Sequence, residues 1–414
     1  MSEREKSVVF TPGQIGRLEI KNRLVRSATY ENGATSKGEV SDALVGIYRN
    51  LAKGGSGLII TSITGVYPSA VSPRLIMRVD DDSFIPGLAK IPRAVREAAP
   101  DCKVVLQLHH PGRQVVNRED AAKFRPVAPP AFVAYVMKHP ELLAPHEGPP
   151  HVVEPTAPAA VYDAFFDRIP RALTAEEIEK IIDAFAEGAR RAQEAGFDGV
   201  QIHAAHGYLL SSFLSPRTNV RDDAYGGSTE NRTRIIRKIY RRARRKVGDD
   251  FPILIKMNTT DFLPGGVDLD EALRIGKIIT ETGFTAIETG GGMYESLTRK
   301  EEELGWKPVL LAEARTGIKT KDQEAYFLPA AKAIKEKTNA TVILVGGLKS
   351  FSRIEEVLES RAVDFVSMSR PLIRQPDLPN LWLSGQGPDK AECISCNACL
   401  PVGKDPFDCR ARKA

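Results

Sequence analysis

The chain has 414 residues, 42% of them hydrophobic and 27% charged, a composition typical of globular proteins and not of disordered or fibrous ones. Its net charge of +5 is small for this length, so charge gives no indication of a nucleic-acid or membrane partner. No apolar run approaches the roughly 18 residues that a membrane helix needs, and Met1–Lys6 lacks a signal-peptide core, so we expect a cytoplasmic protein.

Short apolar runs alternate with helical patterns along the chain. Each run is nearly continuous, as expected of strands buried on both faces of a parallel sheet. Eight such β-then-α units predict the α/β class and a (β/α)8 TIM barrel. A doubly wound sheet is the alternative, but no Gly-x-Gly-x-x-Gly sequence follows any run. The predicted strands are Leu24–Tyr30, Gly57–Thr64, Lys103–His110, Gly199–Ala205, Ile253–Asn258, Ala286–Gly291, Thr341–Gly347 and Phe365–Pro371.

Three segments add to the barrel pattern. Val8–Ile20, with turn residues at Gly13 and Gly16, predicts an N-terminal hairpin that closes the barrel bottom. Gln114–Arg171 is a long, proline-rich loop after the third strand, which predicts a lid or substrate wall, with a disordered insertion as the alternative. Four of the five cysteines lie in the last 22 residues. We therefore predict a barrel over residues 1–385 and a cysteine-rich tail over residues 386–414.

Two helical segments carry clear signals. Thr174 and Glu177 form a capping box that opens an amphipathic helix, which Gly196 closes. The segment Asn231–Val247 is dense in arginine and lysine, yet its apolar residues fall on one helical face. We therefore interpret it as an outer barrel helix with a solvated charged face, in preference to a nucleic-acid-binding helix.

The fourth predicted strand ends in two histidines and a tyrosine. Active sites of such barrels lie where the strands end, and His203, His206 and Tyr208 stand within six residues there. Two imidazoles can hold a carbonyl or nitro oxygen, and a phenol can deliver a proton to a carbanion. The alternatives are a zinc pair or purely local hydrogen bonds, although a histidine pair without an acidic or cysteine ligand beside it is a weak zinc signal.

The last two strands end in residues suited to an anion. Gly346 and Gly347 follow the seventh strand, and Ser369 and Arg370 follow the eighth. Exposed backbone N–H groups beside an arginine can hold a phosphate, which barrels of this class often bind between these two strands. The alternative is that the glycines merely form turns.

Several of these motifs together resemble the old yellow enzyme family of FMN-dependent NADH:flavin oxidoreductases, from about Val8 to Leu378. The most specific stretch begins at Gly199, contains the two histidines and Tyr208, and continues beyond Ser215 to Arg232. Further matches are the opening Ile15–Arg23, the segment Gln107–Arg113, the glycine pair, and Arg370–Leu372.

The resemblance implies a role for each strand end. Ser27, Ala28 and Thr29 would lie beside FMN, with Thr29 near the flavin C4 oxygen. Gln107 would bind the pyrimidine edge, and Lys256 would place a cation near N1 where the family often has arginine. Gly346, Gly347, Ser369 and Arg370 would hold the phosphate. His203 and His206 would bind the substrate oxygen and Tyr208 would donate the proton.

The implied activity is that of an ene-reductase. NADH or NADPH would reduce the flavin, and an α,β-unsaturated carbonyl or nitro compound would then take hydride from N5. Two alternatives stay open: a flavin-dependent amine or N-methyl dehydrogenase, and a non-catalytic flavin and thiolate redox sensor. We expect small-molecule partners, no nucleic acid or membrane, and a homo-oligomer.

The tail carries a possible metal-ligand set in Cys393, Cys396, Cys399 and Cys409, spaced C-x2-C-x2-C-x9-C. Three close cysteines with a remote fourth are more typical of an iron–sulfur site than of a two-knuckle zinc site. Larger relatives of the family, similar to dienoyl-CoA reductase and trimethylamine dehydrogenase, carry a [4Fe–4S] cluster just after the barrel. The alternatives are zinc and an unoccupied remnant.

Overall fold

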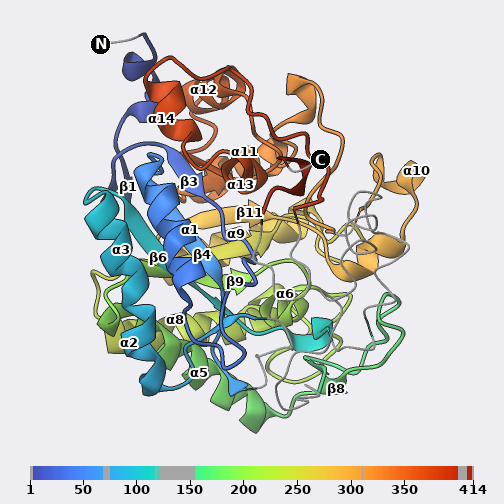
Figure 1. Ribbon diagram of the computed structural model, residues 1–414. Coiled ribbons are helices and arrows are strands. Elements are labelled where there is room, and N and C mark those ends of the chain that lie inside the picture. The colour runs from blue at the N-terminus through green and yellow to red at the C-terminus, as the bar shows by residue number, and fades with distance from the viewer. Residues whose placement is uncertain are drawn as a thin grey trace.

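Eight parallel strands close into a barrel at the centre of the molecule (Figure 1). The computed structural model describes residues 3–68, 75–116, 120, 154–309, 311–399 and 408–412. The strands follow the order β3-β13-β12-β11-β10-β9-β6-β4, and a further pairing of β3 with β4 completes the circle. Their bounds are β3 Leu24–Arg26, β4 Leu58–Gly65, β6 Lys103–His109, β9 Gly199–Ala204, β10 Ile253–Asn258, β11 Ile287–Gly290, β12 Val342–Leu344 and β13 Phe365–Met368.

The predicted TIM barrel and all eight predicted strands are confirmed, but some strands are shorter than predicted. β12 ends before Gly346 and Gly347, whose φ angles of 147° and 74° leave the extended conformation. β13 ends at Met368 because helix α13 (Arg370–Arg374) begins two residues later. Gly346, Gly347 and Ser369 therefore lie just beyond the strands, and Arg370 begins α13.

An N-terminal hairpin closes the barrel at the end where its strands begin, as predicted. Its strands β1 (Gly13–Ile15) and β2 (Leu18–Ile20) are antiparallel. Ile15 and Ile20 are fully buried against apolar side chains from the barrel strands. The predicted start at Val8 is wrong, since Val8–Phe10 forms a 3-10 turn.

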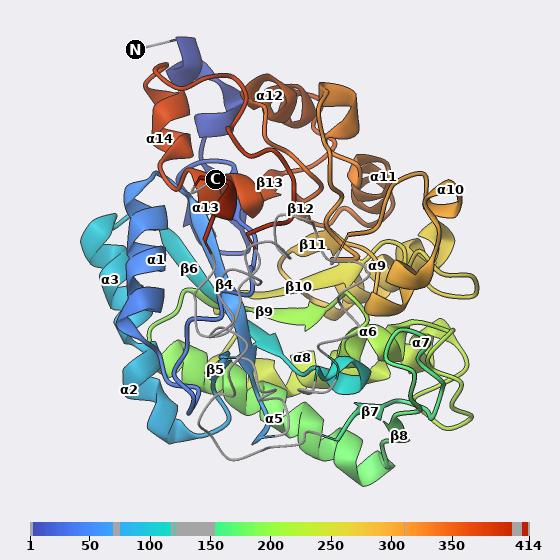
Figure 2. The same cartoon turned by 45° about the vertical axis from the view of Figure 1, so that its right-hand side comes forward.

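Helices surround the barrel, and Figure 2 shows them outside the strands from a second direction. No helix in the described ranges is long and apolar enough to cross a membrane. The main helices are α1 Asp42–Lys53, α3 Lys90–Ala98, α5 Ala175–Glu194, α8 Arg234–Val247, α9 Leu269–Thr282, α11 Leu328–Thr338, α12 Phe351–Glu359 and α14 Leu378–Leu383, with shorter helices α2 Ile85–Leu88, α6 Leu209–Leu214, α7 Thr229–Arg232, α10 Glu301–Leu304 and α13.

Both sequence signals for helices are confirmed. The capping box of Thr174 and Glu177 opens α5. The basic helix α8 packs beside α5, with its isoleucines buried and three of its cations paired to acidic residues of α5. These pairs are Lys238 and Arg242 with Glu179, and Lys246 with Glu187. The basic face thus contacts a neighbouring acidic helix.

A buried ion pair joins Arg113, which follows β6, to Asp163 near the end of the long loop. Arg113 Nε donates to Asp163 Oδ2 over 2.9 Å, and both side chains are at most 2% exposed. Asp163 also accepts hydrogen bonds from the backbone of Phe165 and Phe166. These two rings pack near Tyr208 and form part of a wall at the barrel mouth. The strands β7 (Thr156–Ala157) and β8 (Arg171–Ala172) pair beside it, whereas most of the predicted lid lies outside the described residues.

Removing the Asp163 charge should destabilise the protein. We expect Asp163→Asn to cost about 3 kcal/mol of unfolding free energy, because it leaves the buried Arg113 cation with only the Glu295 carboxylate, which is 3.8 Å away. The exposed Asp167 offers a matched control, since among the described residues its carboxylate accepts a hydrogen bond from the Tyr162 hydroxyl alone. Asp167→Asn should change stability by less than about 0.5 kcal/mol. Denaturant titration measures both values, and equal losses would contradict a special role for the buried pair.

Candidate active site

The buried carboxylate of Glu288 contacts polar side chains from four neighbouring strands or strand ends inside the barrel. Glu288 of β11 is fully buried and accepts hydrogen bonds from Ser27 Oγ at 2.7 Å, Gln201 Nε2 at 2.9 Å and Ser367 Oγ at 2.8 Å. Lys256 Nζ lies 3.2 Å from Glu288 Oε1. Since a buried charge requires a partner, the lysine and the carboxylate fix one another in place.

The same network holds three residues that we predicted to contact a flavin. Gln107 Nε2 donates to Gln201 Oε1 over 2.7 Å, and Lys256 Nζ donates to Ser27 Oγ over 2.9 Å. The structure thus brings Ser27, Gln107 and Lys256 together. Sequence reasoning missed Gln201 and Glu288, although their polar side chains inside otherwise apolar strands were a usable signal.

The ends of β3 and β13 are tied together beside this network. Thr29 Oγ1 lies 2.8 Å from Ser369 Oγ, and Arg26 Nη1 donates to the Ser369 carbonyl over 2.5 Å. The other end of Arg26 pairs with Glu31 at 2.8 Å. Burial raises the pKa of Glu31, and the Arg26 guanidinium opposes that shift. Ala28 packs against the apolar cluster inside the barrel.

The turn after β9 is held in an unusual conformation by two side chains. His206 has a φ of 63°, in the left-handed region that non-glycine residues seldom adopt. Its N–H donates to Asn258 Oδ1 over 2.9 Å, and its carbonyl accepts from Gln114 Nε2 over 2.6 Å. Strained residues of this kind are common at functional sites, where the surroundings compensate for the cost.

The predicted His203, His206 and Tyr208 come together, and a third histidine joins them. The Tyr208 ring lies 5.2 Å from the His203 ring centroid and 4.6 Å from that of His109. His109 ends β6, and its Nδ1 is 2.9 Å from His203 Nδ1. Burial lowers the pKa of His203 and of His206 well below the ordinary value, so both imidazoles are neutral. His109 falls within the predicted strand Lys103–His110, but the sequence analysis assigned it no role.

An aromatic wall borders Tyr208. The rings of Phe165 and Phe166 contact Tyr294, and the Tyr294 ring lies 6.4 Å from the Tyr208 ring in an edge-on arrangement. This wall places an apolar surface beside Tyr208.

Two arginines near β12 and β13 have no anionic partner. Arg370 Nη1 donates to the Arg315 carbonyl over 2.9 Å and to Asn397 Oδ1 over 2.7 Å. The Arg315 guanidinium stacks on Tyr326, its Nε is buried without a hydrogen-bond partner, and burial lowers its pKa. Neither arginine has an ion pair within the described part of the chain. Sequence reasoning missed Arg315 because it does not follow a strand.

The predicted glycine pair is required by packing. A side chain at Gly347 would approach Ile318 to 2.4 Å and Tyr326 to 2.8 Å, and a side chain at Gly346 would approach the backbone nitrogen of Phe327 to 3.1 Å. The glycines therefore do form a necessary turn.

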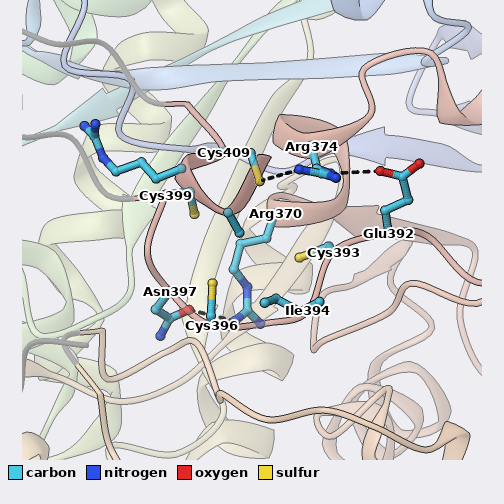
Figure 3. Close-up of a pocket in the computed structure, with 11 residues that line it drawn as sticks. Arg370, Arg374, Glu392, Cys393, Ile394, Cys396, Asn397, Cys399 and Cys409 are labelled. Carbon is cyan, nitrogen blue, oxygen red and sulfur yellow. Dashed lines mark hydrogen bonds and ion pairs between the residues drawn. The ribbon is translucent and has the colours of Figure 1, made fainter. Parts of the chain in front are cut away.

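The four tail cysteines line one cavity of about 80 Å³ (Figure 3). Arg370 and Arg374 line it too, so the arginine predicted to hold phosphate also faces the cysteines. Arg374 pairs with Glu392 and contacts Cys409 Sγ at 3.8 Å. Burial raises the pKa of the Cys399 thiol to about 12. Within the described ranges, no three His, Cys, Asp or Glu side chains are close enough together to hold one metal ion.

The tail is attached to the barrel by several hydrogen bonds. Lys349 Nζ donates to the Cys393 carbonyl over 3.1 Å, and Asn397 Nδ2 donates to the carbonyls of Val309 and Ala314, each over 2.9 Å. The predicted division at residue 385 stays a prediction.

Comparison with known proteins identifies the family. The model of the NADH:flavin oxidoreductase / NADH oxidase family matches residues 8–385. An NADH oxidase from Thermoanaerobacter brockii is 34% identical over 94% of this chain and 52% of its own length. A 4,4'-dithiodibutanoate disulfide reductase from Rhodococcus erythropolis is 30% identical over 98% of this chain and 95% of its own length.

A solved structure supports the same conclusion. A 2-naphthoyl-CoA reductase complex superposes with a TM-score of 0.78 at 27% identity, covering 95% of this chain and 54% of that one. This chain spans about half the length of the first curated relatives that it matches, at 52% and 51%. The chain belongs to the NADH:flavin oxidoreductase / NADH oxidase family, that of old yellow enzyme.

Proposed function

We propose that this protein is an ene-reductase that uses NADH or NADPH to reduce the activated C=C bond of α,β-unsaturated carbonyl or nitro compounds. The observation that carries the proposal is the meeting of His203, His206 and Tyr208 at the barrel mouth. Neutral imidazole donors and a nearby phenol are the groups needed to stabilise an oxyanion and to protonate a carbanion.

The residues at the mouth fit FMN. Arg315 and Arg370 provide two cations without an anion in the described part of the chain, as a phosphate requires. Thr29, Gln107 and Lys256 offer polar groups for the ring. When bound, FMN supplies the group that accepts hydride from the nicotinamide and passes it to the substrate.

The protein's own side chains account for the remaining requirements. The imidazoles of His203 and His206 would hold the activating oxygen without adding a charge, because burial keeps both rings neutral. Tyr208 would protonate the α-carbon. Tyr294 and the phenylalanines of the wall would place an apolar surface beside the tyrosine.

We also propose that the tail cysteines hold a [4Fe–4S] cluster. The support is their spacing and their position around one cavity. A single zinc ion needs all its ligands about 2.3 Å away, and the described cysteines do not meet at such a point. A [4Fe–4S] cubane does not require the four thiolates to converge on one point, since each thiolate binds a different iron.

Replacing Tyr208 by phenylalanine separates the two half-reactions. In an anaerobic stopped-flow experiment, we expect Tyr208→Phe to leave flavin reduction by NADH near the parental rate. Reoxidation by cyclohexenone should slow by 10²-fold or more, roughly the contribution of a general acid. If cyclohexenone reoxidises the flavin of the variant at the parental rate, another group is the proton donor. If the parent itself reduces no enone or nitroalkene but does oxidise amines, the ene-reductase proposal fails.

Replacing Arg370 should release FMN. We expect Arg370→Ala to lower FMN retention at least tenfold, the loss of a charge-assisted hydrogen bond worth about 1.5–3 kcal/mol. Fluorescence of released flavin measures it. Arg374→Ala is the matched control, since Arg374 lines the same cysteine cavity but pairs with Glu392. Equal FMN loss in both variants would mean that Arg370 acts through the tail and does not hold the phosphate.

Protein prepared without oxygen should contain iron and sulfide. We expect about four of each per chain. Replacing both Cys393 and Cys396 by serine should abolish the iron and leave FMN content largely intact, because the barrel strands end before the tail begins. One zinc without sulfide would assign the site to zinc, and neither metal would identify it as a remnant.

A further inference from the structure

Both peptide groups of His206 are held by side-chain amides. Its N–H donates to Asn258 Oδ1 over 2.9 Å, and its carbonyl accepts from Gln114 Nε2 over 2.6 Å. The two amides are equally buried, at 3% exposure, and come from different parts of the barrel. Gln114 ends the 3-10 turn Gly112–Gln114 that follows β6, and Asn258 ends β10. The left-handed turn after β9 is therefore bound by two residues that lie far from it in the sequence.

The same two amides bind the backbone of Gly292–Tyr294, the segment that follows β11. Gln114 Oε1 accepts from the Tyr294 N–H over 2.9 Å, and Asn258 Nδ2 donates to the Gly292 carbonyl over 3.0 Å. An amide side chain suits both positions because it carries a donor and an acceptor side by side. Each amide thus joins the His206 turn to the segment that carries the Tyr294 ring.

Gln114 makes the more selective of the two links. Asn258 Nδ2 also donates to Asp261 Oδ1 and to Ser211 Oγ, so its replacement would disturb further contacts. Within the described part of the chain, both side-chain hydrogen bonds of Gln114 serve the link between the two segments.

Gln114 also packs directly on the turn. Gly207 has a φ of 76°, and a side chain at this position would collide with the Gln114 carboxamide and with Met293. The backbone on the other side of Gln114 is anchored, because the neighbouring Arg113 forms the buried ion pair with Asp163. The position of the Gln114 amide is therefore fixed by packing as well as by hydrogen bonds.

Tyr208 belongs to both of the segments that Gln114 joins. It follows Gly207 in the turn, and its ring meets the Tyr294 ring edge-on, with 6.4 Å between the centroids. Tyr294 begins the 3-10 turn Tyr294–Thr298, and Gln114 holds the first N–H of that turn. Gln114 thus fixes both the backbone from which the phenol extends and a ring against which it packs.

We propose that Gln114 is a positioning residue for Tyr208: by joining the His206 turn to the Tyr294 segment, it holds the phenol where its hydroxyl proton passes to the substrate α-carbon after hydride has reached the β-carbon. This inference rests on the proposed function and deepens it. Catalysis depends steeply on geometry, and a displacement of about 1 Å can slow a step on the order of a hundredfold.

The first test uses the unmodified holoenzyme. Amide hydrogen exchange, resolved residue by residue, gives a protection factor for the His206 N–H and for the Tyr294 N–H. If the two segments form one unit, both amides open together, and we expect protection factors that agree within about threefold. A larger difference would show that the segments open independently and would overturn the proposal.

The second test is a double-mutant cycle between Gln114 and Tyr208. Gln114→Met keeps an unbranched side chain of similar length but removes both hydrogen bonds. In anaerobic stopped-flow, we expect it to slow flavin reoxidation by cyclohexenone about tenfold in the parent and less than about twofold in Tyr208→Phe, because the group that Gln114 positions is then absent. Flavin reduction by NADH should change less than about twofold, and FMN content serves as the control for folding.

Asn219→Leu is the matched control. Asn219 is also 3% exposed, and its Nδ2 donates to the carbonyls of Phe213 and Tyr225, each over 2.8 Å. In the ranges that the structure describes, its hydrogen bonds reach neither the His206 turn nor the Tyr294 segment. We expect this substitution to lower thermal stability about as much as Gln114→Met does, and to leave reoxidation by cyclohexenone within about twofold of the parent.

Three results of the kinetic comparison would contradict the proposal. Reoxidation at the parental rate in Gln114→Met would show that Gln114 does not position the donor, and equal slowing with and without the Tyr208 hydroxyl would show that it acts on another group. Equal slowing by Asn219→Leu would indicate a general effect of losing a buried amide. Failure of the proposed function is recognised separately, because a parent that reduces no enone still reports by hydrogen exchange whether the two segments open together.

Discussion

The paired charges of Lys256 and Glu288 organise the barrel mouth. Both lie inside the barrel on adjacent strands, and Glu288 also accepts hydrogen bonds from residues of β9, β13 and the β3 end. Breaking such a buried pair typically costs about 3–5 kcal/mol. Because Gln107 is bound to this network through Gln201, one charge pair fixes the direction of most polar groups that would face a flavin ring.

The carboxylate also affects the chemistry that the lysine can perform. A lone lysine would present a full positive charge to the ring, whereas Lys256 lies 3.2 Å from a carboxylate that offsets much of its field. The hydroxyl of Ser27, bound to both groups, adds a further fixed dipole. The electrostatic environment of a flavin ring bound beside Lys256 would therefore depend on the pair and not on the cation alone.

Arg370 links the proposed phosphate site to the cysteine tail. It follows β13, where a phosphate is expected, and its guanidinium reaches Asn397 within the cysteine tail. Asn397 in turn holds the loop that contains Arg315 through the Ala314 carbonyl. A change at the tail can thus reach the proposed phosphate site through one hydrogen-bonded path.

Sequence patterns predicted the barrel well because each strand is an apolar run that any parallel barrel buries. They also predicted that His203, His206 and Tyr208 lie together, since the three are adjacent in the chain. They could not predict that His109 lies against His203 or that Arg315 lies beside Arg370, because those contacts depend on tertiary packing. Strand ends were misplaced where positive φ angles, as at Gly347, interrupt the extended backbone.

The proposed hydride transfer and protonation by Tyr208 are tested most directly by following the two hydrogens added to a substrate. Turnover of 2-methylcyclohexenone with unlabelled NADH in deuterated water, stopped before solvent exchange, places each isotope by NMR. We expect hydrogen at the β-carbon and deuterium at the α-carbon, added to opposite faces, because hydride and the Tyr208 proton come from different sides. Deuterium at the β-carbon, or addition of both atoms to one face, would contradict it.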